Sequence, residues 1–524
     1  MTGPADRHYP RDELIEDARY LAATLEDAHP DPYVGHDGRV HFHRRVEELI
    51  REVPDEGEPV SEFYGRAAEI AARVGDGHTG LSPAQPADGE ENYSLPIAFR
   101  VIGSELYVEG VYKEPCEDLL GGRLISVEGI PVADLVSRVA RVDGADNVIH
   151  DRTNLTRALR AVTPLRYLID GFVSPVTVTV EKRDGSTAER ELAPVDGETS
   201  EAPIAELSTV IVFPETGGEP AYRFLDADHS TALLVVPDMF SYREAHEKLH
   251  AMGYERAEEL ARDAYIDTVG DSPPDVSEAV VAALPSAVEV LTDLVEEMAQ
   301  AGTDRLVIDT RDNSGGNSLL SHALTYVLHG WDGIEKSGEG HFKVPKDSEL
   351  YREQIGEDGP IGDTDNPAGF DFGWYFDRSD PDERLARLRE WLSDSPTVAA
   401  ELERGEYEAY YLPDSVVVVT SATTYSAGAE PAFTLSELGA AVVGVPPSQA
   451  LNAPRDLLED ELPNTGLDLK TSYRHVESRP GVDGKLFRPD VELTPDRFEA
   501  MGRTADAGVR LALEAEANEE PPPE

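Results

Sequence analysis

A run of four valines, Val416–Val419, constrains the fold of this chain more than any other sequence feature. Four consecutive β-branched residues without a polar interruption predict a strand buried on both faces, as in a parallel sheet covered by helices. The strand leads into the hydroxyl-rich turn TSATTYSAG, residues 420–428, and then into an expected helix. In this turn, Ser421 or Ser426 is either a helix cap or a nucleophile presented where backbone N–H groups converge.

The chain alternates between strands and helices from about residue 230 onward. Apolar runs and apolar periodicity predict strands at 231–239, 304–309 and 440–445, and helices at 285–301 and 318–328. This alternation is typical of a mainly parallel sheet with crossover helices, so the expected fold class is α/β.

The pattern differs in the part of the chain that precedes this region. Leu14, Ala18 and Leu21 recur at helical spacing and predict helices within 11–75, whereas short alternating strands occupy about 93–200. One pair of these strands is predicted to form a hairpin with Asp-Gly at its turn. We therefore expect four parts: an N-terminal helical region (1–90), a β domain (91–200), an α/β core (201–510) and an acidic disordered tail (511–524).

The charge of the chain excludes some classes of partner. There are 103 acidic residues against 46 basic ones, which gives a formal net charge of −57. Such a surface repels phosphate backbones and anionic membranes, so neither nucleic acid nor a membrane is an expected partner. Acidity that is spread along a chain with 40% hydrophobic residues indicates a folded halophilic protein, kept soluble in a salt-rich cytoplasm.

Cysteine content and apolar stretches limit the remaining options. Cys116 is the only cysteine, which excludes a disulfide within the chain and a multi-cysteine metal site. Neither an apolar signal core at the start nor a run of 18 apolar residues is present, so we expect a cytoplasmic protein.

The sequence HEKLH matches a short zinc-peptidase pattern. On a helix, this pattern places two histidine ligands and a glutamate base on one face. Its residues are His246, Glu247, Lys248, Leu249 and His250, with Glu258 or Glu259 as a possible third ligand. The flanking residues are polar and amphipathic, which favours a chance match over a metal site.

Three separate segments carry the residue types that acyl transfer requires. His78 lies between glycines in VGDGHTGLS, a buried strand ends in Asn-Ser-Gly-Gly at 313–316, and Ser426 follows the valine strand. A serine, a histidine and a flexible turn with accessible N–H groups supply nucleophile, base and oxyanion donors. Distance in the sequence leaves open whether the fold brings them together.

The motifs resemble those of a family of serine peptidases that includes the C-terminal processing (tail-specific) proteases, the tricorn protease core and the interphotoreceptor retinoid-binding protein modules. Four stretches carry the resemblance: DGHTGL at 76–81, LLGGRLISVEGIPVADLV at 119–136, DTRDNSGG at 309–316 and TTYSAGAE at 423–430. The resemblance implies a ClpP/crotonase-like α/β catalytic core, a PDZ-like β domain at 91–200 and an N-terminal helical region. It covers roughly residues 10–495.

The same resemblance implies a serine endopeptidase that acts on peptides or proteins without a cofactor. Ser426 corresponds to the nucleophile, and the N–H of Ala427 together with that of Gly315 or Gly316 corresponds to the oxyanion hole. The relatives that carry retinoids leave a non-catalytic ligand- or peptide-binding protein as the alternative. The sequence leaves the substrate and the oligomeric state open.

The expected general base is His78. The processing proteases use a lysine about 25 residues after the serine, where this chain has Leu451, and no lysine lies between Ser426 and Lys470. The resemblance to the histidine-using branch implies His78 instead, whose ordinary pKa suits a base near neutral pH. In that branch a C-terminal acid orients the histidine, and Asp483 or Glu477 in VESRPGVDGKLFRPDVEL is the expected residue.

Overall fold

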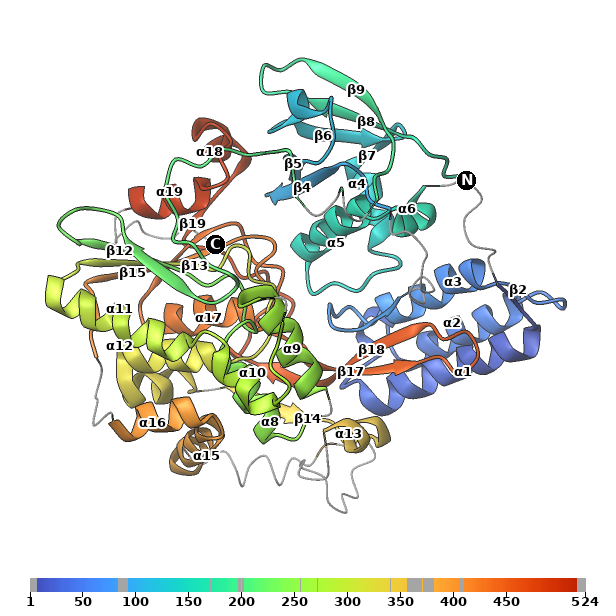
Figure 1. Ribbon diagram of the computed structural model, residues 1–524. Coiled ribbons are helices and arrows are strands. Elements are labelled where there is room, and N and C mark those ends of the chain that lie inside the picture. Colours follow the sequence, from blue (N-terminus) through green and yellow to red (C-terminus); the bar gives the residue numbers. More distant parts are fainter. Residues whose placement is uncertain are drawn as a thin grey trace.

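The structure is a computed structural model that describes residues 7–82, 93–169, 171–196, 199, 202–254, 256–270, 272–339, 341–355, 370, 381–404 and 410–515. Among these residues, no helix is both long enough and apolar enough to cross a membrane. Figure 1 shows helices at the N-terminus, a separate β domain, and an α/β core in which the central strands are flanked by helices.

The N-terminal region is helical, as predicted. Its helices are α1 (Arg11–Ala28), α2 (Arg39–Glu52) and α3 (Val60–Ala72), with the short β1 (His8–Tyr9), β2 (Glu58–Pro59) and 3₁₀ turn η1 (Val34–His36) between and beside them. The apolar faces of the helices form one core, to which distant Leu462, Leu467 and Leu469 also contribute. The region is therefore packed against the C-terminal third of the chain.

The β domain is an antiparallel sheet with helices against it. Its order is β10-β5-β6-β8-β9, with β4 paired to β5 and β7 paired to β6. The strands are β4 (Ile97–Ile102), β5 (Glu105–Val111), β6 (Arg123–Val127), β7 (Ile130–Pro131), β8 (Val176–Glu181), β9 (Thr187–Leu192) and β10 (Ala205–Glu206). The helical elements are η2 (Glu117–Leu119), α4 (Val132–Val139), α5 (Val148–Arg160) and α6 (Val162–Leu168). Strands β8 and β9 form the predicted hairpin.

The α/β core is built on a sheet of order β11-β12-β13-β15-β16-β19. Its strands are β11 (Ala221–Phe224), β12 (Thr231–Val235), β13 (Arg305–Asp309), β15 (Ser415–Thr420), β16 (Ala441–Gly444) and β19 (Val491–Glu492). The pairs from β12 to β19 are parallel, which confirms the predicted parallel sheet, and β11 is antiparallel to β12. The valine strand β15 lies between β13 and β16, with Val416–Val419 buried.

Helices surround this sheet. They are α8 (Arg243–Ala251), α9 (Ala257–Thr268), α10 (Ser277–Ala283), α11 (Ala287–Ala301), α12 (Leu319–Ser337), α15 (Pro381–Ser393), α16 (Pro396–Arg404), α17 (Glu430–Glu437), α18 (Pro495–Ala500) and α19 (Ala507–Glu514). Helix α19 buries Leu511 and Ala512, so the expected tail boundary at 511 falls inside a helix. The rest of the expected tail, 516–524, lies outside the described residues.

A further sheet joins the N-terminal region to the core. Its order is β14-β18-β17, and β3 also pairs with β18. The members are β3 (Gly80–Ser82), β14 (Phe342–Pro345), β17 (Asn452–Glu461) and β18 (Asp468–Glu477), with helix α13 (Glu349–Gln354) after β14. Figure 1 shows the orange β17–β18 hairpin beside the blue N-terminal helices. The β3–β18 pairing fixes the segment that follows His78.

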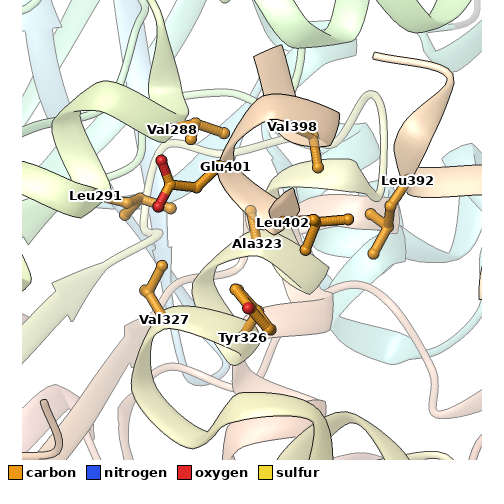
Figure 2. A pocket seen from close by; sticks show the side chains of 9 residues that line it. All are labelled: Val288, Leu291, Ala323, Tyr326, Val327, Leu392, Val398, Glu401 and Leu402. Carbon is orange, nitrogen blue, oxygen red and sulfur yellow. The ribbon is translucent and has the colours of Figure 1, made fainter. Parts of the chain in front are cut away.

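A small cavity lies between α11, α12, α15 and α16 (Figure 2). Its volume is about 20 Å³, and its lining is mostly apolar, including Leu291, Val327 and Leu392. A space of this size holds about one water molecule. It is a packing defect of the core rather than a substrate site.

Candidate active site

The turn after β15 presents Ser426 in a strained backbone conformation. Ser426 begins the 3₁₀ turn η3 (Ser426–Ala429) and has φ +51°, in the left-handed region that non-glycine residues rarely adopt. Strain of this kind at a strand-to-helix turn is characteristic of nucleophile elbows. Ser426 is half-buried.

The other hydroxyls of this turn stabilise its shape. Thr424 Oγ1 donates to the carbonyl of Thr310, 2.7 Å away, and accepts from the N–H of Ser421 at 2.9 Å. Ser421 Oγ donates to the carbonyl of Arg311. These bonds tie the end of β15 to the end of β13, so Ser421 is engaged in the backbone while the Ser426 hydroxyl faces a side chain.

That side chain is His78. Its Nε2 lies 3.1 Å from Ser426 Oγ, although the two residues are 348 positions apart in the sequence. The imidazole is 9% exposed and stacks on the ring of Tyr425 with centroids 4.8 Å apart. Gly77 makes this approach possible, because a Cβ there would lie 2.1 Å from the His150 ring and 2.5 Å from the Tyr425 hydroxyl.

The second ring nitrogen of His78 faces a tyrosine. Tyr425 Oη lies 2.8 Å from His78 Nδ1, whereas the nearer oxygen of Asp76 is 3.6 Å from it. Asp76 Oδ1 instead accepts the backbone N–H of His78 at 2.8 Å. Asp76 therefore shapes the loop and acts on the imidazole through its charge, while Tyr425 is the direct partner.

Asp76 is buried and fully hydrogen-bonded. Its Oδ2 accepts from Thr79 Oγ1 and Ser472 Oγ, both at 2.6 Å, and contacts His29 Nε2 at 3.2 Å. The N–H of Asp31 donates to His29 Nδ1, so that nitrogen carries no proton and Nε2–H donates to Asp76. Burial alone would raise the pKa of Asp76, but these bonds and the neighbouring histidines hold it well below its usual range. An ionised carboxylate thus lies beside the His78 loop.

A second carboxylate, Asp146, accepts the N–H of Gly77 in the His78 loop and lies close to Asp76 and His78. Burial raises its pKa to about 6, and the charge of Asp76 adds to the rise. The pKa of His78 responds to both acids: burial alone would lower it, but the nearby Asp76 carboxylate, aided by the charge of Asp146, raises it above the ordinary value. Tyr425 is buried, which raises the pKa of its hydroxyl well above 10 and keeps it protonated.

The glycine turn after β13 lies against Ser426. Asn313 organises it: its Oδ1 accepts the N–H of Gly315 at 3.0 Å, and its carbonyl accepts the N–H of Tyr425 at 3.0 Å. A Cβ on Gly315 would lie 2.7 Å from the Cβ of Ser426, so only glycine allows this approach.

The two candidate glycines differ in how their N–H groups are used. Met239 forms a bridge with Gly316 in which it bonds the carbonyl of Gly315 and the N–H of Asn317. The N–H of Gly316 has no acceptor among the described residues, whereas that of Gly315 is already bonded to Asn313. Ala427 lies in the first turn of η3, where N–H groups lack intrahelical acceptors. Ala427 and Gly316 are therefore the donors available for an oxyanion.

The structure does not bring the expected C-terminal acids to His78. Asp483 is exposed and accepts from Asn452 Nδ2 at 3.1 Å, and Glu477 ends β18 opposite Asn452 and Phe342. Ser472, which contacts Asp76, lies on the same strand five residues before Glu477, or about 16 Å away at the rise of a strand. Asp76, Asp146 and Tyr425 occupy the expected position instead. Asp76 and Tyr425 lie within the quoted motifs, close to His78 and Ser426 in the sequence, whereas no motif marks Asp146.

Lys470, the first lysine after Ser426, and the residues of the HEKLH zinc pattern make other contacts. Lys470 is exposed and paired with Glu459 at 3.0 Å. On α8, His246 is buried while His250 is exposed, and the Glu247 carboxylate accepts from Thr397 Oγ1 and Ser395 Oγ. The HEKLH residues therefore do not converge on one ligand site.

Among the described residues, one group of His, Asp and Glu side chains could hold a metal ion by distance. It consists of Asp76, His78 and Asp146, whose ligand atoms lie within 4.8 Å of one another. The oxygens of both carboxylates already accept hydrogen bonds from protein donors, and His78 Nε2 faces Ser426. The geometry fits a hydrogen-bonded acyl-transfer site better than a metal centre.

Comparisons with known proteins place the fold. No sequence family matches the chain, and no curated protein matches it. Among solved structures, mature CPAF is similar over 96% of this chain and 96% of its own, with a TM-score of 0.59 and 15% identity. CPAF in complex with lactacystin gives a TM-score of 0.58 at 15% identity, covering 96% of this chain and 97% of that one. The photosystem II D1 C-terminal processing protease gives 0.39 at 13% identity, over 93% and 94%.

The similarity to CPAF shows the fold at nearly full length. CPAF is a serine peptidase of the family that the motifs resemble, so the resemblance is confirmed at the level of fold. The fold is a mixed helix-and-sheet architecture of that kind.

Proposed function

We propose that this chain is a serine endopeptidase in which Ser426 is the nucleophile and His78 the general base. The observation that carries the proposal is the 3.1 Å contact between His78 Nε2 and Ser426 Oγ. In the reaction, Ser426 Oγ attacks the peptide carbonyl, and His78 takes its proton and passes it to the leaving amine. The N–H groups of Ala427 and Gly316 stabilise the oxyanion.

The environment of His78 supports this role. With Nδ1–H donating to the Tyr425 oxygen, Nε2 is left unprotonated and accepts from Ser426 Oγ. The imidazolium that forms on proton transfer lies beside the carboxylates of Asp76 and Asp146, which stabilise its charge. The expected roles of Asp483 and Glu477 pass to this pair.

The two large parts of the chain then have separate tasks. We assign residues 201–510 to a ClpP/crotonase-like catalytic core and 91–200 to a PDZ-like domain that binds the free C-terminal carboxylate of a substrate. An antiparallel sheet with helices packed on it supports the second assignment. If it is right, amidating the C-terminus of a peptide substrate raises its KM severalfold and leaves kcat unchanged.

The charge of −57 supports a salt-rich cytoplasm as the working environment. The Debye length is roughly 30 Å at 0.01 M salt and about 3 Å at 1 M, so dilution lets the acidic surface repel itself. We expect the melting temperature to fall as salt is lowered. A melting temperature independent of salt would contradict the halophilic assignment.

A fluorophosphonate probe tests the central proposal, because it labels only an activated serine. We expect labelling of the wild type and loss of labelling in Ser426→Ala, together with a fall in peptide hydrolysis of about 10⁴-fold or more. Ser421→Ala is the matched control and should still be labelled. An unlabelled, inactive wild type would instead favour the non-catalytic binding protein.

A further inference from the structure

Asp146 gathers donors from three distant parts of the chain. It lies in the β domain, directly before Asn147, which caps helix α5. Asp146 Oδ1 accepts the N–H of Gly77 at 2.8 Å, and Oδ2 accepts the N–H of Ala450 at 3.0 Å and Nε2 of Gln449 at 2.5 Å. The hydroxyl of Tyr425 is a fourth, longer contact at 3.5 Å. All four groups are donors, so an ionised carboxylate satisfies every one.

These contacts reach both halves of the proposed catalytic pair. Gly77 immediately precedes His78, so its bond to Asp146 holds the backbone of the base. On the other side, Gln449 donates to Asp146 and accepts the backbone N–H of Ser426 at 3.1 Å through its Oε1. One carboxylate thus links the loop of the base to the backbone of the nucleophile.

Asp146 also determines which way the Tyr425 hydroxyl points. Tyr425 Oη lies between His78 Nδ1 and Asp146 Oδ1. While the hydroxyl donates to the carboxylate, its oxygen accepts Nδ1–H of His78, and Nε2 is the acceptor that Ser426 needs. Without the carboxylate, the hydroxyl can donate to Nδ1, which moves the imidazole proton to Nε2 and removes the base.

The position of Asp146 is itself fixed by contacts between the β domain and the core. Asn147 Nδ2 donates to the carbonyl of Ser448 at 2.8 Å, and Thr153 Oγ1 donates to the carbonyl of Ala422 at 3.1 Å. The segment that carries Asp146 is therefore anchored on both turns that flank the site.

We infer that Asp146 is a positioning residue of the proposed peptidase: it holds Ser426 and His78 in register and sets the productive tautomer of His78 through Tyr425. The inference rests on the proposed function and adds to it a residue from the β domain.

The test compares Asp146→Asn with Asp151→Asn in the full-length protein. Asp151 lies in helix α5, which begins two residues after Asp146, and burial likewise raises its pKa to about 6, which makes it a matched control. We expect Asp146→Asn to lower kcat about 100-fold with KM within about threefold. The NH₂ group of the asparagine would face N–H groups that now donate to Asp146, so the catalytic groups would lose their alignment. Asp151→Asn should keep wild-type kcat and KM.

A tautomer measurement separates positioning from mere structure. In protein labelled with ¹⁵N-histidine, the nitrogen signals of His78, assigned with His78→Ala, report which ring nitrogen carries the proton. We expect Nδ1–H in the wild type and a shift toward Nε2–H in Asp146→Asn. If Asp146→Asn does not fold, Tyr425→Phe replaces it, with an expected fall in kcat of about tenfold.

The outcomes are distinguishable from failure of the proposed function. An active wild type with kcat unchanged in both Asp146→Asn and Tyr425→Phe would overturn the inference and leave the peptidase assignment intact. An unchanged His78 tautomer in a slow Asp146→Asn would overturn the tautomer role. A wild type that neither hydrolyses peptides nor reacts with fluorophosphonate would overturn the proposed function itself.

Discussion

Two buried histidines, each within a short recognisable motif, have contrasting surroundings. His78 in the DGHTGL loop has a partner at each ring nitrogen, Ser426 Oγ at 3.1 Å and Tyr425 Oη at 2.8 Å. His246 in the HEKLH helix is fully buried, and neither of its ring nitrogens has a hydrogen-bond partner among the described residues. The two rings differ in the hydrogen-bonding groups that the rest of the fold places beside them.

The contrast appears in opposite pKa shifts. Burial disfavours the charged form of both rings. At His78 the Asp76 carboxylate outweighs burial and raises the pKa, whereas at His246 burial prevails and lowers the pKa to about 4. The pKa of a buried histidine therefore depends on whether a carboxylate lies beside the ring.

The largest expected effect separates the two histidines by activity. We expect His78→Ala to lower kcat/KM by roughly 10³- to 10⁴-fold, because the general base is lost. His246→Ala should change kcat/KM less than about twofold. The measurement is steady-state hydrolysis of one peptide by both variants. Equal losses of kcat/KM in the two would contradict a special role for His78.

The pH dependence of kcat/KM sharpens the account of His78. A base must be deprotonated, so activity should rise with pH through a midpoint above 6.5, the ordinary value that Asp76 raises. Replacing Asp76 by Asn removes that charge, and the midpoint should move to lower pH. A midpoint that stays in place would show that Asp76 does not act on His78 electrostatically.

His246 should affect stability rather than activity. Its pKa is about 4 in the folded protein and 6.5 when exposed, so between these values the unfolded chain binds the extra proton. Stability therefore falls as pH drops below 6.5, by about 2 kcal/mol at pH 5 for this group. Denaturant unfolding should show a loss between pH 7 and pH 5 that is smaller by about that amount in His246→Leu, since the other histidines contribute equally to both proteins.

The smallest expected effect concerns metal removal. Because His246, Glu247 and His250 do not converge, a chelator should leave peptide hydrolysis within about twofold of the untreated protein. If a chelator inactivated the protein and added zinc restored activity, the catalytic site would instead be the HEKLH residues of α8.

Local patterns predicted much of the fold and the centre of the site. Val416–Val419 predicted the central strand because burial on both faces requires an apolar run, and periodicity predicted α1, α11 and α12. Ser426 and His78 stood out by their flanking glycines and small residues, and the family resemblance then assigned their roles. These are features that neighbours in the sequence determine.

The rest of the site depends on contacts that no local pattern encodes. Asp146 is 69 residues from Gly77 and 303 from Gln449, and it lies among 103 acidic residues that look alike in the sequence. Asp483 and Glu477 were expected from their place near the end of the chain, but the length of β18 carries them past His78. Only the three-dimensional structure shows which of the many carboxylates lies near His78.

The pairing of β3 with β18 has a consequence for biosynthesis. Gly80–Ser82 bond to Asp468–Lys470, so the segment after His78 acquires its partner only when most of the chain has been made. At about 5–20 residues per second, the ribosome takes tens of seconds to cover that interval. Throughout it, the loop that carries His78 lacks this support. If the proposed function holds, the topology therefore delays proteolytic competence until translation is nearly complete.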